Sequence, residues 1–285
     1  MADDDNTTDV RYRPFVLASV RDGSLDDAVS AVSETVKAAG FTLAGVYKAT
    51  PTSTVIVVTS AEMLQHAAET VRGGFGAVVR IGCTQIGGSV QISYTNPQYM
   101  CFTYRMAGDN SALAAKLAQV LGAEKSFGSA KGMSEKRARK YQYKIGMEHF
   151  DETETLIKYK TFEEALAKTD AALSAATEIV KVCRVDIPGR NEVLYCCGLQ
   201  NSTDKYANDA YLMSKIDGEA VKHTPHMPYE VLVAEHKVVA LHPRFRIAIS
   251  FPDLSMVGDG SFMEIMDAPK AILKSLTVAV GGKPQ

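Results

Sequence analysis

An internal repeat is the feature of this 285-residue sequence that most limits the folds open to it. The apolar segment 15–20 is followed by Gly23, by Ser24 as a helix-capping residue, and by an apolar stripe with helical spacing. The second half shows the same order, because the apolar segment 156–159 is followed by Thr161 and another helical stripe. Both halves are therefore expected to begin with the same succession of strand and helix.

The ends of the two halves show a second correspondence. Each half carries two apolar segments that predict paired strands, followed by a helix that stops at a glycine. The paired strands are expected at 77–85 and 90–95 in the first half, and at 229–234 and 245–251 in the second. The closing helices are expected at 111–121 and 271–280. Three landmarks in the same order predict a duplicated α+β unit.

The repeat divides the chain into four parts. We predict a flexible acidic N-terminus at 1–11, a first α+β copy at 12–122, and a connector at 123–153 in which basic residues precede acidic ones. The second copy is expected at 154–285. Its extra length lies near 186–227, and we expect specificity there because loops on a repeated scaffold carry it.

One segment of the second half resembles a known bacterial family, the domain of unknown function 302. From Met227 to Glu235 the sequence reads Met-Pro-Tyr-Glu-Val-Leu-Val-Ala-Glu. Members of that family carry a similar Leu-Pro motif before a strand, a turn and a strand that ends near an aromatic residue and a proline. The resemblance covers about two thirds of the chain as a tandem pair, although Gly74-Phe75-Gly76 replaces the Pro-Tyr motif in the first half.

The resemblance implies a fold but no activity. It implies an α+β protein with two similar domains, each a curved, mostly antiparallel sheet with helices packed on one face. It also implies a tendency to dimerise, so we expect a homodimer or larger homo-oligomer. The family description assigns no reaction, cofactor or catalytic residue.

Composition and charge exclude several classes of protein. The chain has 31 Lys and Arg against 33 Asp and Glu, so no general positive field attracts nucleic acid. The N-terminus is acidic where a signal peptide is basic, and no apolar run is long enough to span a membrane. The five cysteines include no C-x-x-C pair, which indicates reduced thiols. We expect a soluble, cytoplasmic protein with neither membrane nor nucleic-acid partners.

Candidate ligand-binding residues lie around the final strands of each half. In the first half they are Tyr94 and Asn96, and in the second half they are His226, Tyr229, Arg244 and Arg246. Tyrosine offers an apolar wall with a polar tip, the amide both donates and accepts, and arginine binds anions through two nitrogens. A strand at 245–251 would place both arginines on one face. These residue types predict a site for a small anionic or aromatic ligand.

Two other groups of residues suggest a different chemistry. His223-x-x-His226 would suit a metal on a helix, but Pro225 and Pro228 disfavour a helix there, so no metal site is predicted. Cys196 and Cys197 are adjacent in an apolar strand and point to opposite faces, which favours simple packing. The alternative interpretation is a reactive thiol.

The leading hypothesis is therefore a tandem-domain binding protein, with no catalytic residue or cofactor assigned. The alternatives are an enzyme or carrier in sulfur or haem chemistry that uses a cysteine thiolate, and a structural subunit of a larger assembly.

Overall fold

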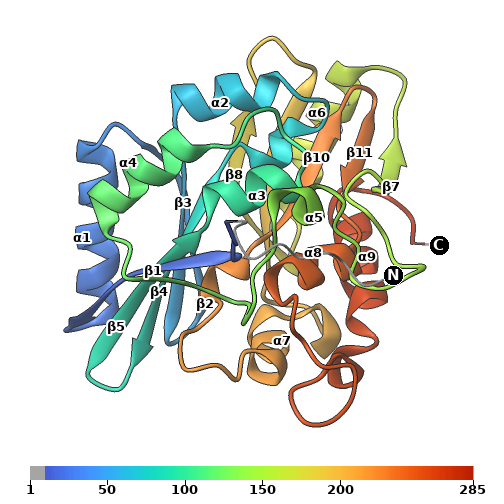
Figure 1. The fold of residues 1–285 in the computed structure, drawn as a ribbon. Coiled ribbons are helices and arrows are strands. Elements are labelled where there is room, and N and C mark those ends of the chain that lie inside the picture. Colours follow the sequence, from blue (N-terminus) through green and yellow to red (C-terminus); the bar gives the residue numbers. More distant parts are fainter. Residues whose placement is uncertain (1–9, 285) are drawn as a thin grey trace.

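The computed structural model describes residues 10–284, which form two antiparallel sheets flanked by helices (Figure 1). The predicted α+β class is confirmed. Most of the N-terminal segment predicted to be flexible, residues 1–9, lies outside the described residues. Within the described part, no helix combines the length and apolar character needed to cross a membrane.

The first half builds one sheet and the helices beside it. Its elements are β1 (Phe15–Asp22), α1 (Leu25–Ala38), β2 (Thr42–Thr50), β3 (Ser53–Thr59), α2 (Ala61–Ala68), the short 3-10 helix η1 (Gly73–Gly76), β4 (Val79–Ile86), β5 (Ser89–Thr95), α3 (Pro97–Thr103) and α4 (Ser111–Leu121). The connector adds β6 (Lys125–Phe127) and α5 (Glu135–Arg139).

The second half builds the other sheet. Its elements are β7 (Glu154–Lys158), α6 (Phe162–Ala175), β8 (Ile179–Asp186), β9 (Glu192–Leu199), η2 (Lys205–Ala207), α7 (Asp209–Ile216), η3 (Thr224–His226), β10 (Tyr229–Ala234), β11 (Lys237–Ala240), α8 (Pro243–Ser250), η4 (Phe262–Ile265) and α9 (Ala268–Ala279).

The predicted helix starts depend on local capping. The Ser24 hydroxyl oxygen accepts a hydrogen bond from the Asp27 amide at 3.2 Å, and Thr161 accepts one from Glu164 at 3.2 Å. Ser134 caps α5 in the same way. Each cap satisfies an amide that the first helical turn leaves without a partner, which fixes where the helix begins.

The two sheets have corresponding strand orders. The first runs β2-β3-β4-β5-β1-β6 and the second runs β8-β9-β10-β11-β7 when read from the matching edge. If β1 to β5 are matched in chain order to β7 to β11, each strand takes the same place in its sheet. β6, from the connector, is the additional strand, and it pairs with β1.

The strand predicted at 245–251 is wrong, because this segment belongs to helix α8. β10 instead pairs with β11, and Glu235 adopts a left-handed conformation at the intervening turn. Pro243 then occupies the first turn of α8, where its fixed φ suits a helix, and His242 caps that turn by accepting from the Arg244 amide at 3.1 Å. Asn96-Pro97 before α3 therefore corresponds to His242-Pro243.

The insertion that lengthens the second half is shorter than the predicted segment 186–227. That segment contains β9, a strand in the interior of the sheet whose place in the order matches that of β3. The longer connection follows β9, where η2, α7 and η3 precede β10.

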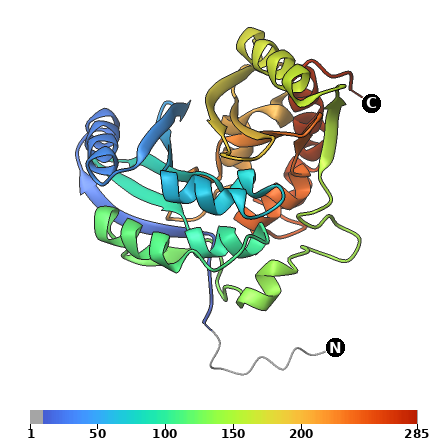
Figure 2. The same ribbon diagram turned by 90° about the horizontal axis from the view of Figure 1, so that it is seen from above.

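Helices cover the outer face of each sheet. Part of each inner face is covered by a short 3-10 helix that comes from the other half of the chain. α1 and α4 lie outside the first sheet, and α6 and α9 outside the second (Figure 2). η3 of the second half lies against β3, β4 and β5, whereas η1 of the first half lies against β9 and β10. Each half therefore covers part of the inner sheet face of the other.

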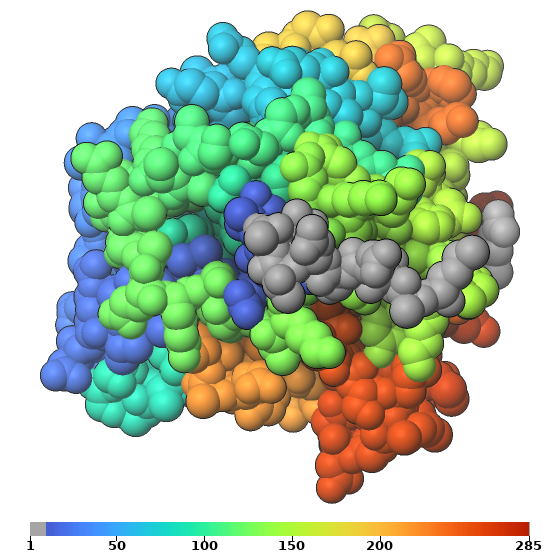
Figure 3. Space-filling model, in the orientation of Figure 1, coloured from blue at the N-terminus to red at the C-terminus, as the bar shows by residue number. Residues whose placement is uncertain are grey.

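The connector also joins the halves. In Figure 3 its yellow-green residues lie between the first half and the red C-terminal region. The Tyr141 hydroxyl donates to the Ala248 carbonyl at 3.0 Å, and Asp151 forms an ion pair with Arg105 at 2.9 Å. The connector is thus part of the packing between the two halves.

The edge strands β2 and β8 approach each other closely at Gly45. A Cβ atom at Gly45 would lie 2.4 Å from the Val182 carbonyl oxygen and 3.1 Å from the Cys183 Cβ. Both neighbours are held by a sheet strand, so a side chain at Gly45 would push the two sheets apart.

We predict that Gly45→Ala lowers the free energy of unfolding by about 1–3 kcal/mol, the usual cost of inserting a methyl group into a packed region. Gly88→Ala is the matched control, because a Cβ there meets no atom within 4 Å. Urea unfolding of both variants provides the measurement. Equal stability of the two variants would contradict the close approach.

Candidate functional site

Arg246 of α8 lies at the centre of a buried polar cluster. Its side chain is 1% exposed, and its Nε donates to the Glu230 carboxylate at 2.9 Å. Nη1 donates to His226 Nδ1 at 3.0 Å and to the Ser250 hydroxyl at 3.1 Å. Nη2 donates to the Pro228 carbonyl at 3.1 Å. All three guanidinium nitrogens therefore have protein acceptors.

Arg80 of β4 reaches the same carboxylate from the first half. It forms an ion pair with Glu230, and its Nε donates to the Pro225 carbonyl at 2.8 Å. Burial and the neighbouring Arg246 lower the pKa of Arg80 to about 10, so it stays charged near neutral pH. Two guanidiniums thus share one carboxylate, and the cluster bridges the two halves.

The histidine of the cluster is neutral. Burial, reinforced by Arg246 and Arg80, lowers the pKa of His226 well below its usual value. Its Nδ1 accepts from Arg246, so the proton of the neutral ring resides on Nε2, which lies 3.3 Å from the Tyr229 hydroxyl oxygen. His226 therefore serves as a neutral acceptor for Arg246.

The structure brings His226, Tyr229 and Arg246 together but separates Arg244 from them. Residues two apart on a helix lie on nearly opposite faces, so the expected pair of arginines on one strand face does not exist. Arg244 is instead half-exposed and binds Glu148 through its Nε at 3.0 Å.

The first-half candidates lie elsewhere and have local partners. Tyr94 belongs to the core beneath α1 and α4, and its hydroxyl donates to the Gly122 carbonyl at 3.1 Å. The Asn96 side chain caps α3 by accepting from the Gln98 amide at 3.1 Å, and it donates to the Arg13 carbonyl at 2.9 Å. Both residues have a structural role in these positions.

Cys196 and Cys197 lie in β9 and are fully buried. Contact with the Cys183 thiol, together with burial, raises the pKa of Cys196 well above its usual value. Burial also raises the pKa of Cys197. Neither position supplies an exposed thiolate.

The sequence predictions missed Arg80 and Glu230 as members of this cluster. Each is a single charged residue in an otherwise apolar part of its strand, and the two strands hold matching places in their sheets. A charged residue inside a buried strand requires a partner, so that pattern is the signal that could have identified them.

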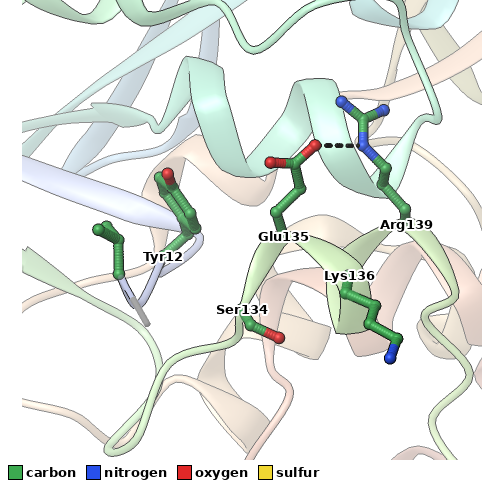
Figure 4. Close-up of a pocket in the computed structure, with 6 residues that line it drawn as sticks. Tyr12, Ser134, Glu135, Lys136 and Arg139 are labelled. Atoms are coloured by element: carbon green, nitrogen blue, oxygen red, sulfur yellow. Dashed lines mark hydrogen bonds and ion pairs between the residues drawn. The ribbon is translucent and has the colours of Figure 1, made fainter. Parts of the chain in front are cut away.

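A separate open groove of about 400 Å³ lies beside α5 (Figure 4). Val10 and Tyr12 form one side, and Ser134, Glu135, Lys136 and Arg139 form the other. The Tyr12 ring packs edge-on against Phe102 at 4.8 Å between centroids. Glu135 binds Arg139 at 2.7 Å. The groove therefore presents an aromatic ring opposite charged side chains.

No family model, curated protein or solved structure matches this chain. Among residues 10–284, no group of three or more histidine, cysteine, aspartate or glutamate side chains could hold a metal ion.

A second buried contact joins the halves at Asp209, the first residue of α7. One carboxylate oxygen accepts from the Tyr47 hydroxyl at 2.8 Å and from the Leu199 amide at 3.0 Å. Burial raises the pKa of Asp209 to about 7, against an ordinary value of 3.8. This carboxyl is therefore more easily protonated in the folded protein than in the unfolded chain.

We predict that Arg246→Met lowers the free energy of unfolding by about 3–5 kcal/mol, because it removes one partner of a buried ion pair. Arg244→Met, two residues earlier on the same helix, is the matched control. Its loss should be clearly smaller, because the Arg244 side chain is 39% exposed and solvent screens its charge. Guanidinium unfolding of both variants tests this, and similar losses would show that the buried cluster is not stabilising.

We predict that Asp209→Asn reduces the dependence of stability on pH. The folded-state pKa of Asp209 is raised, so its stabilising contribution is complete below about pH 4 and is lost as the pH rises through about 7. Asparagine keeps an acceptor for Tyr47 and Leu199 without the charge. Melting temperatures at pH 5.5 and 8 should differ less in the variant, and an unchanged difference would contradict the shifted pKa.

Proposed function

We propose that this chain is a non-catalytic binding protein built from two similar α+β domains. The corresponding strand orders support the tandem arrangement, as do the matching caps Asn96 and His242, each followed by a proline in the first turn of a helix. This is also the fold that the resemblance to the domain of unknown function 302 implies. Homodimer formation and a cytoplasmic location stay predictions.

The proposed ligand site is the groove beside α5. The open volume of about 400 Å³ next to Tyr12 carries this proposal, because a ligand needs space as well as polar groups. The buried cluster around Arg246 is less suited, since the guanidinium nitrogens of that arginine already have protein acceptors. We therefore place the ligand outside the cluster that the sequence favoured.

The groove suits a small aromatic molecule with an anionic group. The partly exposed Tyr12 ring offers a surface for stacking. Glu135 is paired with Arg139, whose Nη1 also donates to the Met106 carbonyl at 2.8 Å, so these two charges largely offset each other. The exposed Lys136 leaves positive charge at the rim, where it would attract the anionic group.

The burial of the thiols favours binding over catalysis. An enzyme or carrier that uses a thiolate needs a sulfur within reach of its substrate, whereas Cys196 and Cys197 are fully buried. The proposed function therefore assigns no catalytic role to either residue.

Phenyl phosphate is a suitable probe for the groove, with binding measured by ligand-observed NMR titration. We expect Lys136→Glu to weaken its binding about 5- to 150-fold, the effect of losing about 1–3 kcal/mol from a charge-assisted hydrogen bond. Tyr12→Ala should weaken it by removing the stacking surface.

Lys274→Glu is the control, because it makes the same charge change on an exposed residue of α9, far from the groove in sequence. Equal binding by the Lys136→Glu and Lys274→Glu variants would place the ligand elsewhere. No binding of phenyl phosphate by the unaltered protein would reject this ligand class.

A further inference from the structure

We propose that Cys183 and Cys196 are a redox pair that forms a reversible disulfide within the second sheet. The two residues face each other on the adjacent antiparallel strands β8 and β9. This inference is independent of the groove beside α5.

The strand pairing already supplies the separation that a disulfide requires. Directly opposed residues of antiparallel strands have Cα atoms about 4.5–5.5 Å apart. A disulfide accepts Cα separations of about 4.4–6.8 Å. Both residues also belong to the same buried core. The bond can therefore form without a change in strand register.

The other cysteines are placed differently. Cys197 lies next to Cys196 on the strand, so its side chain points to the opposite face, and it pairs with Lys181 across β8. Cys83 and Cys101 belong to the first half, and the Cys101 thiol donates to the Ala107 carbonyl at 3.4 Å. The sheet geometry thus selects Cys183 as the partner of Cys196.

Cys183 is the less buried member of the pair, so we assign the first step to it. It lies on β8, an edge strand, and retains 6% exposure, whereas Cys196 is fully buried. The contacts from Cys196 lower the pKa of Cys183, and a thiolate is the attacking species in thiol–disulfide exchange. The Cys183 thiol and burial raise the pKa of Cys196, and the nearby positive charge of Arg80 opposes part of this shift.

The oxidant is a low-molecular-weight disulfide such as oxidised glutathione. The Cys183 thiolate attacks one glutathione sulfur, the glutathione disulfide bond breaks, and one glutathione leaves as a thiolate. Cys196, on losing its proton, attacks the Cys183 sulfur of the mixed disulfide and releases the second glutathione. The protein dithiol loses two electrons and two protons, which reduce one oxidised glutathione to two thiols.

Both sulfurs lie where the halves meet. Gly45 of β2 approaches the Cys183 Cβ, and Arg80 of β4 interacts with Cys196. The first half therefore contacts both members of the proposed pair.

The test uses the whole native protein in buffers of increasing ratio of oxidised to reduced glutathione, quenched with acid and treated with an alkylating reagent. We expect an oxidised species that lacks two hydrogens and yields a peptide cross-linked between Cys183 and Cys196. Cys183→Ser and Cys196→Ser should abolish this species. Cys197→Ser, the adjacent control, should retain it.

Three results would overturn the proposal: a cross-link that involves another cysteine, loss of two hydrogens in either single variant, or thiols that stay free in excess oxidised glutathione. Circular dichroism of each sample confirms that the reacting protein is folded. If a serine variant fails to fold, the cross-linked peptide from the unaltered protein decides the question alone.

Discussion

The shared carboxylate of Glu230 determines how the two halves are arranged. A buried guanidinium is strongly destabilising without a charged partner, and here Arg80 of the first half and Arg246 of the second both pair with this one carboxylate. Because hydrogen bonds require short distances and defined directions, the cluster fixes β4 relative to β10 and α8. The apolar contacts between the sheets are less directional. The buried polar cluster therefore specifies how one sheet is positioned against the other. Its complete burial also explains why this cluster is a poor candidate for ligand binding.

Local signals predicted the parts of the fold that local interactions decide. Ser24 and Thr161 each cap the expected helix, because a cap is formed within a few residues of sequence. The segment 245–251 is predicted to be a strand because the repeat matches it to the strand at 90–95 in the first half. In the folded chain Pro243 begins a helix there, and the buried partners of Arg246 favour it over a strand. Those partners are distant in sequence, so periodicity alone could not reveal them.

The candidate residues fall into two groups, which differ in where their hydrogen-bond partners lie. His226, Tyr229 and Arg246 were chosen for their chemistry and do meet, but the other cation, Arg80, comes from the opposite half of the chain. Tyr94 and Asn96 could also form hydrogen bonds to a ligand, yet backbone groups of the protein already occupy them. The groove beside α5 was not predicted, since it depends on Tyr12 lying next to a connector helix. The sequence shows which side chains could bind a ligand, but only the fold shows which of them already have partners within the protein.

The exchange of η1 and η3 between the sheets has a consequence for synthesis. The first half is synthesised with Val55, Val57 and Arg80 on a sheet face that later segments help to cover. Until η3 and Glu230 are made, this face lacks part of its cover and its cation lacks the carboxylate. We therefore expect the contacts of this face with the second half to form last, when the chain is nearly complete. We expect the two halves to fold as one cooperative unit, although each has a sheet of its own.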